Sequence, residues 1–199
     1  MQFNVAIYRF KCDNKGDTMR VITGTARGRR LVTLEGDDVR PTTEKVKEAL
    51  FSAIQFEIEG RRVLDLFAGS GQLGIEALSR GAANAVFVDA SKKSVDIVRQ
   101  NLETTGFTKS SVVLNTDSIA FLRTRAEKYD IAFLDPPYRT GLLQKALEGI
   151  DRVMSDSGLI VAECPTDEEF PENAGGFIKT KEYKYGKIKL AIYRKPSED

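Results

Sequence analysis

Apolar runs and amphipathic stretches alternate along most of the chain. A short apolar run that ends in a polar or glycine-rich segment is typical of a buried parallel strand. Five such runs occur, at residues 62–66, 85–88, 111–114, 130–134 and 159–162. Between them, apolar residues recur at helical spacing at residues 72–80, 91–104, around 121–122, and 141–150. Strands that alternate with helices predict an α/β fold with a mostly parallel sheet.

The two ends of the chain predict additional elements. Residues 177–183 and 188–193 predict a closing antiparallel hairpin around the turn 184–187, which brings the sheet to seven strands. Residues 20–24 and 30–34 predict an N-terminal β-hairpin, and residues 155–158 predict a turn before the fifth strand. We expect one domain at residues 19–199, made of a basic hairpin (19–35), an amphipathic helix (40–57) and the sheet with its helices (61–195). Residues 1–18 are expected to form an extension.

Composition excludes several kinds of chemistry. The chain has 199 residues, no histidine and only two cysteines. The lack of histidine excludes Ser-His triads and histidine general bases, and two distant cysteines make neither a disulfide framework nor a zinc site. We therefore expect no metal centre. No apolar run has transmembrane length and the start lacks a signal-peptide pattern, so we expect a cytoplasmic protein.

A glycine-rich turn follows the first predicted strand. Gly69, Gly71 and Gly74 fit the spacing G-x-G-x-x-G, and Asp89 follows Gly69 by twenty residues at the end of the next apolar run. Glycines let the backbone approach a ligand closely, and the helix behind the turn points its N–H groups at that ligand. The spacing suits a dinucleotide as well as S-adenosylmethionine (SAM). Asp65, just before the glycines, favours SAM, because a carboxylate suits an ammonium group better than a pyrophosphate.

The segment Asp135-Pro136-Pro137-Tyr138 follows the fourth predicted strand. The exocyclic amine of a nucleobase is a poor nucleophile because its lone pair is delocalised into the ring. The carboxylate of Asp135 and the carbonyl of Pro136 can accept its N–H bonds, while Tyr138 offers a surface for base stacking. The two prolines stiffen the loop. This pattern predicts amine methylation, although a rigid surface turn is the alternative for the isolated tetrapeptide.

Two further features have alternative interpretations. Asp117 follows the third strand, where it can bind an adenine amino group, cap the next helix, or do both. Arg20, Arg27, Arg29 and Arg30 lie in or beside the predicted hairpin and have no acid among them. They suit RNA phosphates, and the alternative is a solvated basic turn.

From about residue 19 to 195, the chain resembles the RsmD family, bacterial methyltransferases that modify N2 of a guanine in small-subunit (16S) ribosomal RNA. The matching segments are Arg20-Val21-Ile22 and residues 27–31, 40–51, 64–71, 73–82 and 135–138. Thr23 and Ala26 depart from the glycine and the aromatic residue expected in the hairpin. The resemblance implies a Rossmann-like class I SAM-dependent methyltransferase. We expect its partner to be small-subunit ribosomal RNA within a ribosomal particle, and we expect a monomer.

The resemblance also implies roles for individual residues. The residues expected at the cofactor are Arg40, Thr42, Asp65, Phe67, Ala68, Gly69, Gly71, Asp89, Ala90, Asp117 and Ser118. Among these, residues 65–71 would hold the methionine end of SAM, Asp89 its ribose and Asp117 its adenine. Asp135, Pro136 and Tyr138 would hold the target guanine. The rival functions are a DNA adenine or cytosine amino-methyltransferase, a NAD-dependent oxidoreductase and a non-catalytic SAM- or RNA-binding module.

Overall fold

The computed structural model describes residues 19–34 and 44–196. Residues 1–18, 35–43 and 197–199 lie outside the described residues, and so do the expected cofactor residues Arg40 and Thr42. The predicted helix 40–57 is described from residue 44 as α1 (Glu44–Ala53), followed by the short 3₁₀ helix η1 (Gln55–Glu57). None of the helices in the described part of the chain is long and apolar enough to cross a membrane.

One eight-stranded sheet runs through the described residues in the order β3-β2-β1-β4-β5-β8-β7-β6. Its strands are β1 (Arg62–Asp65), β2 (Asn84–Asp89), β3 (Ser111–Asn115), β4 (Tyr129–Leu134), β5 (Met154–Pro165), β6 (Asn173–Ala174), β7 (Phe177–Tyr185) and β8 (Ile188–Arg194). The strands β1 to β5 are parallel, and β8, β7 and β6 continue the sheet antiparallel. The α/β class, the mostly parallel sheet and the closing hairpin are confirmed. The expected seven strands are one too few, because β6 has only two residues and no periodicity to detect.

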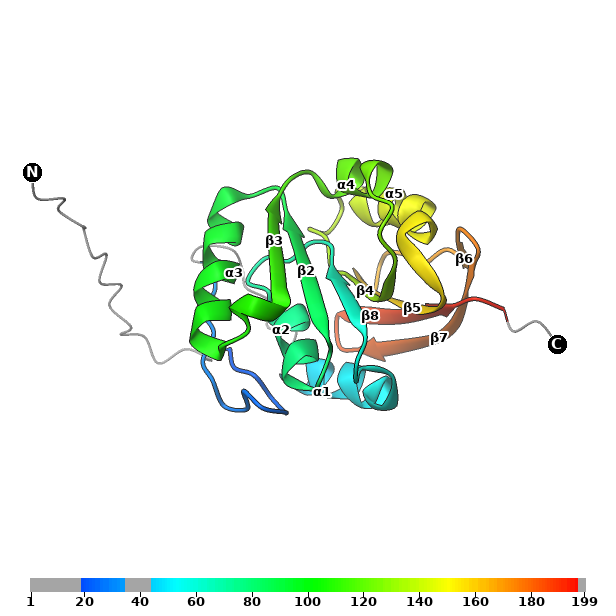
Figure 1. The fold of residues 1–199 in the computed structure, drawn as a ribbon. Coiled ribbons are helices and arrows are strands. Elements are labelled where there is room, and N and C mark those ends of the chain that lie inside the picture. The colour runs from blue at the N-terminus through cyan, green and yellow to red at the C-terminus, as the bar shows by residue number, and fades with distance from the viewer. Residues whose placement is uncertain (1–18, 35–43, 197–199) are drawn as a thin grey trace, which may run out of the picture.

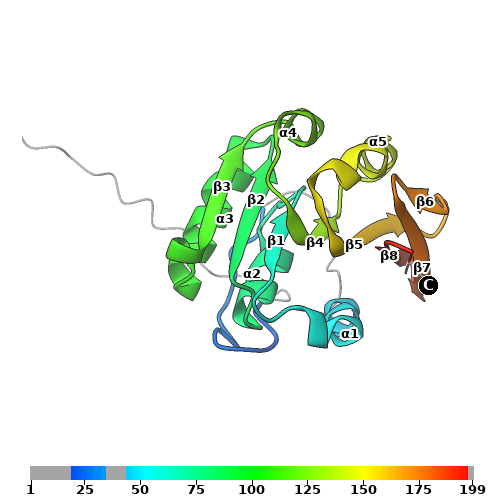
Figure 2. The ribbon, with the colours of Figure 1, turned by 45° about the vertical axis from the view of Figure 1, so that its right-hand side comes forward.

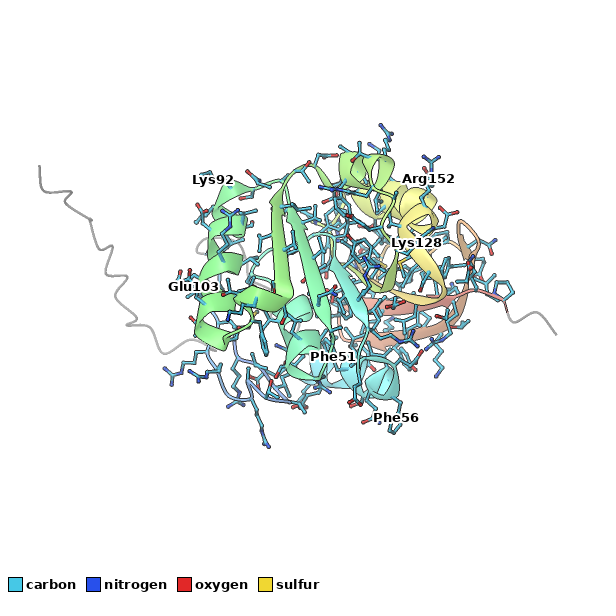
Figure 3. All side chains as sticks on the ribbon, viewed as in Figure 1. Phe51, Phe56, Lys92, Glu103, Lys128 and Arg152 are labelled. Atoms are coloured by element: carbon cyan, nitrogen blue, oxygen red, sulfur yellow. The ribbon has the colours of Figure 1, made fainter. Side chains whose placement is uncertain are left out.

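Helices cover both faces of the sheet (Figures 1 and 2). On one face, α1, α2 (Gln72–Ser79) and α3 (Lys92–Thr105) pack over one apolar cluster. On the other face, α4 (Ser118–Thr124) and α5 (Leu142–Gly149) pack over a second cluster. The remaining elements are the 3₁₀ helices η2 (Thr108–Ser110) and η3 (Ile150–Val153). Phe51 of α1 is fully buried, whereas Phe56 of η1 projects outward with 94% of its surface exposed (Figure 3).

The predicted turn at residues 155–158 is wrong, because β5 continues through it. Tyr129 pairs with Met154 and Ile131 pairs with Leu159, so residues 155–158 form a bulge opposite a single residue of β4. The hydroxyl of Ser155 donates to Asp130 Oδ1 at 2.9 Å and fastens the bulge to β4. The residues that predicted a turn therefore interrupt the pairing of β5 with β4, and they do not precede the strand.

The predicted N-terminal hairpin forms only in part: its two arms run antiparallel and share backbone hydrogen bonds, but the strands expected at residues 20–24 and 30–34 do not form. Residues 19–32 form a loop with a single antiparallel bridge, between Arg20 and Arg30. The backbone N–H groups of Ile22 and Thr23 donate to the carboxylate of Glu76 on α2, at 2.7 and 3.0 Å. Because these groups bond to a helix side chain, they are not available for a β ladder. We call residues 19–32 the arginine loop.

The arginine loop is docked along α2 and not free. Ser79 Oγ donates to the carbonyl of Thr23 at 2.6 Å and accepts from the N–H of Ala26 at 2.9 Å. Gly24 has a φ of +88°, and a Cβ there would lie 1.7 Å from the carbonyl oxygen of Ser79. Any side chain at position 24 would therefore push the loop off the helix.

Candidate active site

The carboxyl ends of β1, β2 and β4 bring three acidic residues to one edge of the sheet: Asp65, Asp89 and Asp135. The chain runs from β1 outward to β3 and then returns to β4 on the other side of β1. This reversal between β1 and β4 is the topological switch point, where open α/β sheets bind ligands. The sequence prediction that these segments share one site is supported by this arrangement.

The glycine loop between β1 and α2 has the conformation that its sequence requires. Gly69 and Gly71 have φ values of +55° and +79°, and Gly71 caps α2. A Cβ on Gly69 would meet no atom within 4 Å, so this glycine faces open space in which a cofactor can lie. Gly74 differs, because a Cβ there would lie 2.3 Å from the ring of Phe87. The third glycine therefore serves helix–sheet packing.

Asp65 lies beneath the glycine loop with 2% of its surface exposed. Its Oδ2 accepts the N–H of Gly74 at 3.0 Å. Burial, together with the nearby charge of Asp89, raises the pKa of Asp65 to about 7, although the hydrogen bond from Gly74 acts in the opposite direction. A buried carboxyl group at the end of β1 would be stabilised in its charged form by a cationic ligand, so the site fits an ammonium or sulfonium group.

Asp89 is fixed at the end of β2 by two backbone N–H groups. Gly69 donates to its Oδ2 at 2.8 Å and Ser91 donates to its Oδ1 at 2.7 Å. Each carboxylate oxygen can still accept a further bond, so ribose hydroxyls can be recognised here. Asn115 holds the next turn by donating to the carbonyls of Asp89 and Ala90, at 3.0 and 2.9 Å.

The other expected cofactor residues lie on the same edge. Phe67 is half-buried, and the N–H of Ala68 donates to the carbonyl of Val88 at 3.0 Å, which ties the glycine loop to β2. Asp117 is the N-cap of α4 and accepts from Ala120 N–H at 2.8 Å, so its capping role is confirmed and its adenine contact stays a prediction. The hydroxyl of Ser118 is buried and donates to the carbonyl of Leu66 at 2.6 Å, which leaves its backbone as the group to face a ligand.

Asp135 and Tyr138 meet a residue that the sequence analysis missed, Glu163 of β5. The Tyr138 hydroxyl donates to Glu163 Oε1 at 2.5 Å. Burial raises the pKa of Asp135 well above its usual range, and the negative charges of Glu163 and Asp65 add to this effect. Burial therefore acts against the ionised form that was expected for Asp135, and its ionisation stays a prediction. Glu163 could have been found as the acid that directly follows the fifth apolar run, residues 159–162.

The loop after Pro136 is held in a strained shape. Arg139 has a φ of +60°, a conformation that is uncommon for residues other than glycine. Its N–H donates to Glu168 Oε1 at 3.0 Å, and its guanidinium donates to Asp167 Oδ2 at 2.7 Å. These contacts stabilise the uncommon backbone conformation of Arg139 and so help to hold Tyr138 beside Glu163.

The arginines that were expected to bind RNA lie at two places. Arg20 forms a bidentate pair with Glu44 of α1, at 2.8 and 2.9 Å, so it has a structural partner. Arg27, Arg29 and Arg30 are all exposed; Arg27 and Arg29 lie near the tip of the arginine loop, whereas Arg30 lies opposite Arg20 at the bridge. That tip docks at the Ser79 end of α2, whereas the glycine loop lies at the other end, about 12 Å away for eight residues of helix.

The base of the arginine loop contacts the glycine loop itself. The buried side chain of Asn101 donates to the carbonyls of Val32 and Ser70, both at 2.9 Å, and accepts the N–H of Val32 at 2.8 Å. Ser70 Oγ lies 3.7 Å from the sulfur of Met19. The arginine loop and the candidate cofactor loop are thus parts of one hydrogen-bonded unit. The described residues contain no group of acids and cysteines that could hold a metal ion.

Comparisons with known proteins identify the family of the chain. The chain is 43% identical to YlbH of Bacillus subtilis, named as an rRNA methyltransferase, over 89% of this chain and 99% of that protein. It is 32% identical to Ribosomal RNA small subunit methyltransferase D of Escherichia coli, over 90% of this chain and 91% of that protein. The solved structure of yhhF from Escherichia coli, named as a methyltransferase, superposes with a TM-score of 0.80 at 32% identity and covers 91% of this chain and 100% of that one. The model of the family described as Conserved hypothetical protein 95 matches residues 19–194. The chain therefore belongs to this family, the RsmD family of ribosomal RNA methyltransferases.

Proposed function

We propose that this chain transfers the methyl group of SAM to the exocyclic N2 amine of a guanine in small-subunit (16S) ribosomal RNA. SAM is the cofactor of the chain. The observation that carries the proposal is the cluster of Asp135, Tyr138 and Glu163 beside the glycine loop. Guanine presents hydrogen-bond donors along the edge that carries N2, and this cluster supplies acceptors together with an aromatic ring.

The residues present fit SAM. The open space above Gly69 leaves room for the cofactor, and the buried carboxyl group of Asp65 suits its positive charge. Asp89 would hold the ribose hydroxyls, and the turn before α4 would face the adenine. When bound, SAM supplies an electrophilic methyl group on a sulfonium centre. The protein therefore has to position the amine and exclude water, and it needs no metal for this step.

Asp135 acts on the amine in two stages. As a carboxylate, it accepts an N2–H bond and draws the nitrogen lone pair out of the ring, toward the methyl group. The positive charge of the bound cofactor favours this ionised form, against the burial that raises the pKa of the carboxyl group. After transfer, N2 carries an extra proton and a positive charge. Asp135 can take this proton, and its raised pKa makes it a better base for the purpose.

Tyr138 fixes the plane of the guanine while Glu163 fixes Tyr138. The hydrogen bond from the Tyr138 hydroxyl leaves the ring face as the surface for stacking. We further propose that the chain acts as a monomer, in the bacterial cytoplasm, on RNA presented within a ribosomal particle. The described residues form one sheet with its covering helices, and this single unit supports a substrate whose shape is already presented.

The test is methyl transfer from labelled SAM to unmodified small subunits, naked rRNA and DNA in parallel. Digestion of the product and mass spectrometry should find the label on N2-methylguanosine, and Asp135→Ala should serve as the inactive control. Label on adenine or cytosine of DNA would instead support the DNA amino-methyltransferase. Calorimetry should detect SAM binding without NAD binding, whereas tight NAD binding alone would favour an oxidoreductase.

A further inference from the structure

A stripe of side chains on β7 lies on the same face of the sheet as Tyr138. Lys181, Tyr183 and Tyr185 occupy alternate positions of the strand and so point to one face. Tyr183 and Tyr185 are half-buried and pack against the same apolar cluster as Tyr138. Their rings are stacked, with centroids 6.3 Å apart and planes 27° apart. We call these three residues the β7 stripe.

The strand register places the β7 stripe beside the candidate active site. Glu163 of β5 pairs with Leu190 of β8, and Leu190 pairs with Tyr183 of β7. Neighbouring strands lie about 4.8 Å apart, so the backbone of Tyr183 lies about 10 Å from that of Glu163. Glu163 accepts the hydrogen bond from Tyr138, so it marks the position of the substrate. Tyr185 lies in the next row, nearer to the edge of the sheet where the candidate active site lies.

The surroundings of the β7 stripe are basic. Lys181 is exposed within the stripe, and Lys187 is exposed in the turn that follows it. The acids nearest to that turn, residues 167–169, are engaged by Arg139 and Lys189. Aromatic rings among lysines, next to a nucleic-acid-modifying site, form the kind of surface that binds single-stranded nucleic acid.

We propose that the β7 stripe binds the single-stranded RNA next to the target guanine. Tyr183 and Tyr185 stack with the flanking bases, and Lys181 contacts a phosphate. An enzyme that modifies a base must take it out of its stack, which leaves the neighbouring bases unstacked. The tyrosines replace part of this lost stacking through the ring surface that packs neither against the other tyrosine nor against the core. This inference rests on the proposed function, since it requires an RNA substrate.

The test replaces both tyrosines by leucine. Tyr183→Leu with Tyr185→Leu keeps an apolar contact with the core but removes the flat rings. The dissociation constant for unmodified small subunits, measured with S-adenosylhomocysteine bound, should rise roughly tenfold per lost stack. The matched variant with phenylalanine at both positions should bind like the parent, and SAM affinity should be unchanged in both.

Lysine variants test the phosphate contact. Lys181→Ala should lower the slope of affinity against salt concentration by about one, whereas Lys145→Ala, at an exposed position of α5, should not change it. If the leucine variant binds small subunits like the parent, the two tyrosines only complete the rim of the core and the proposal is overturned. This assay measures binding and not methylation. If the parent protein methylates no guanine N2, the proposed function is refuted, but the RNA-binding role of the β7 stripe can still be tested.

Discussion

The carboxylate of Glu76 holds the arginine loop on α2, and its removal should both destabilise the protein and release the loop. Glu76 is fully buried. It accepts the N–H groups of Ile22 and Thr23 and the Nε of Arg80, the last at 2.8 Å. The buried ammonium of Lys47 lies 4.0 Å from it, and burial lowers the pKa of Lys47.

The magnitude follows from these partners. Hydrogen bonds to a charged group contribute about 1.5–3 kcal/mol each, but they are not additive when one group accepts several. Removing one partner of a buried ion pair costs about 3–5 kcal/mol, because the other charge stays buried without compensation. We therefore expect Glu76→Ala to lower the free energy of unfolding by about 3–5 kcal/mol, a large part of the 5–15 kcal/mol typical of a domain.

Urea unfolding measures this change, and hydrogen exchange of the Ile22 and Thr23 amides reports the release of the loop. Glu103→Gln is the matched control, since Glu103 is an exposed acid on α3 (Figure 3). It should change the stability by less than about 0.5 kcal/mol. If Glu76→Ala is as stable as this control, or if both amides exchange at the parent rate, the docking role of Glu76 is refuted.

Four further predictions concern the site. Asp135→Ala should lower the rate of single-turnover methyl transfer roughly 10²–10³-fold with little change in SAM affinity. The parent rate should rise with pH as Asp135 ionises. A variant that transfers methyl at the parent rate would contradict the catalytic role of Asp135. Asp65 has a pKa raised by burial, so its contribution to stability is complete below its ordinary value near 3.8 and is lost as pH rises toward about 7; Asp65→Asn should flatten this part of the stability–pH curve in urea titrations. Tyr138→Phe keeps the ring but loses the bond to Glu163, so it should retain more activity than Tyr138→Ala, and the reverse order in the transfer assay would exclude stacking. Replacing Arg27, Arg29 and Arg30 together by Ala should weaken binding to small subunits and flatten its salt dependence without changing SAM affinity; an unchanged slope would return them to a solvated turn.

The parallel part of the fold could be predicted from the sequence because its signals are local. Each strand from β1 to β5 is an apolar run, and each glycine or acid at its end marks the same edge of the sheet. Asp117 shows the same locality, since a cap acts within its own helix. The site residues at the ends of β1, β2 and β4 follow from this rule alone.

The features that were missed depend on partners far away in the sequence. Residues 20–30 have the composition of a hairpin, but the N–H groups of Ile22 and Thr23 bond to Glu76, more than fifty residues later. Glu163 belongs to the site only because β5 pairs with β4 and brings it to Tyr138. The raised pKa of Asp135 comes from burial and from the charges of Glu163 and Asp65, which no local pattern reports.

The short length of β6 determines how the sheet ends. β6 pairs only with Phe177 and Ile178, so beyond these residues no further described strand covers the outer side of β7. An exposed strand edge invites pairing with the edge of another molecule, and charged side chains, lysine above all, oppose such pairing. Lys181 and Lys184 are exposed along this edge. The same lysines thus protect the protein from edge-to-edge aggregation, so variants that remove both of them should be checked for self-association at high concentration.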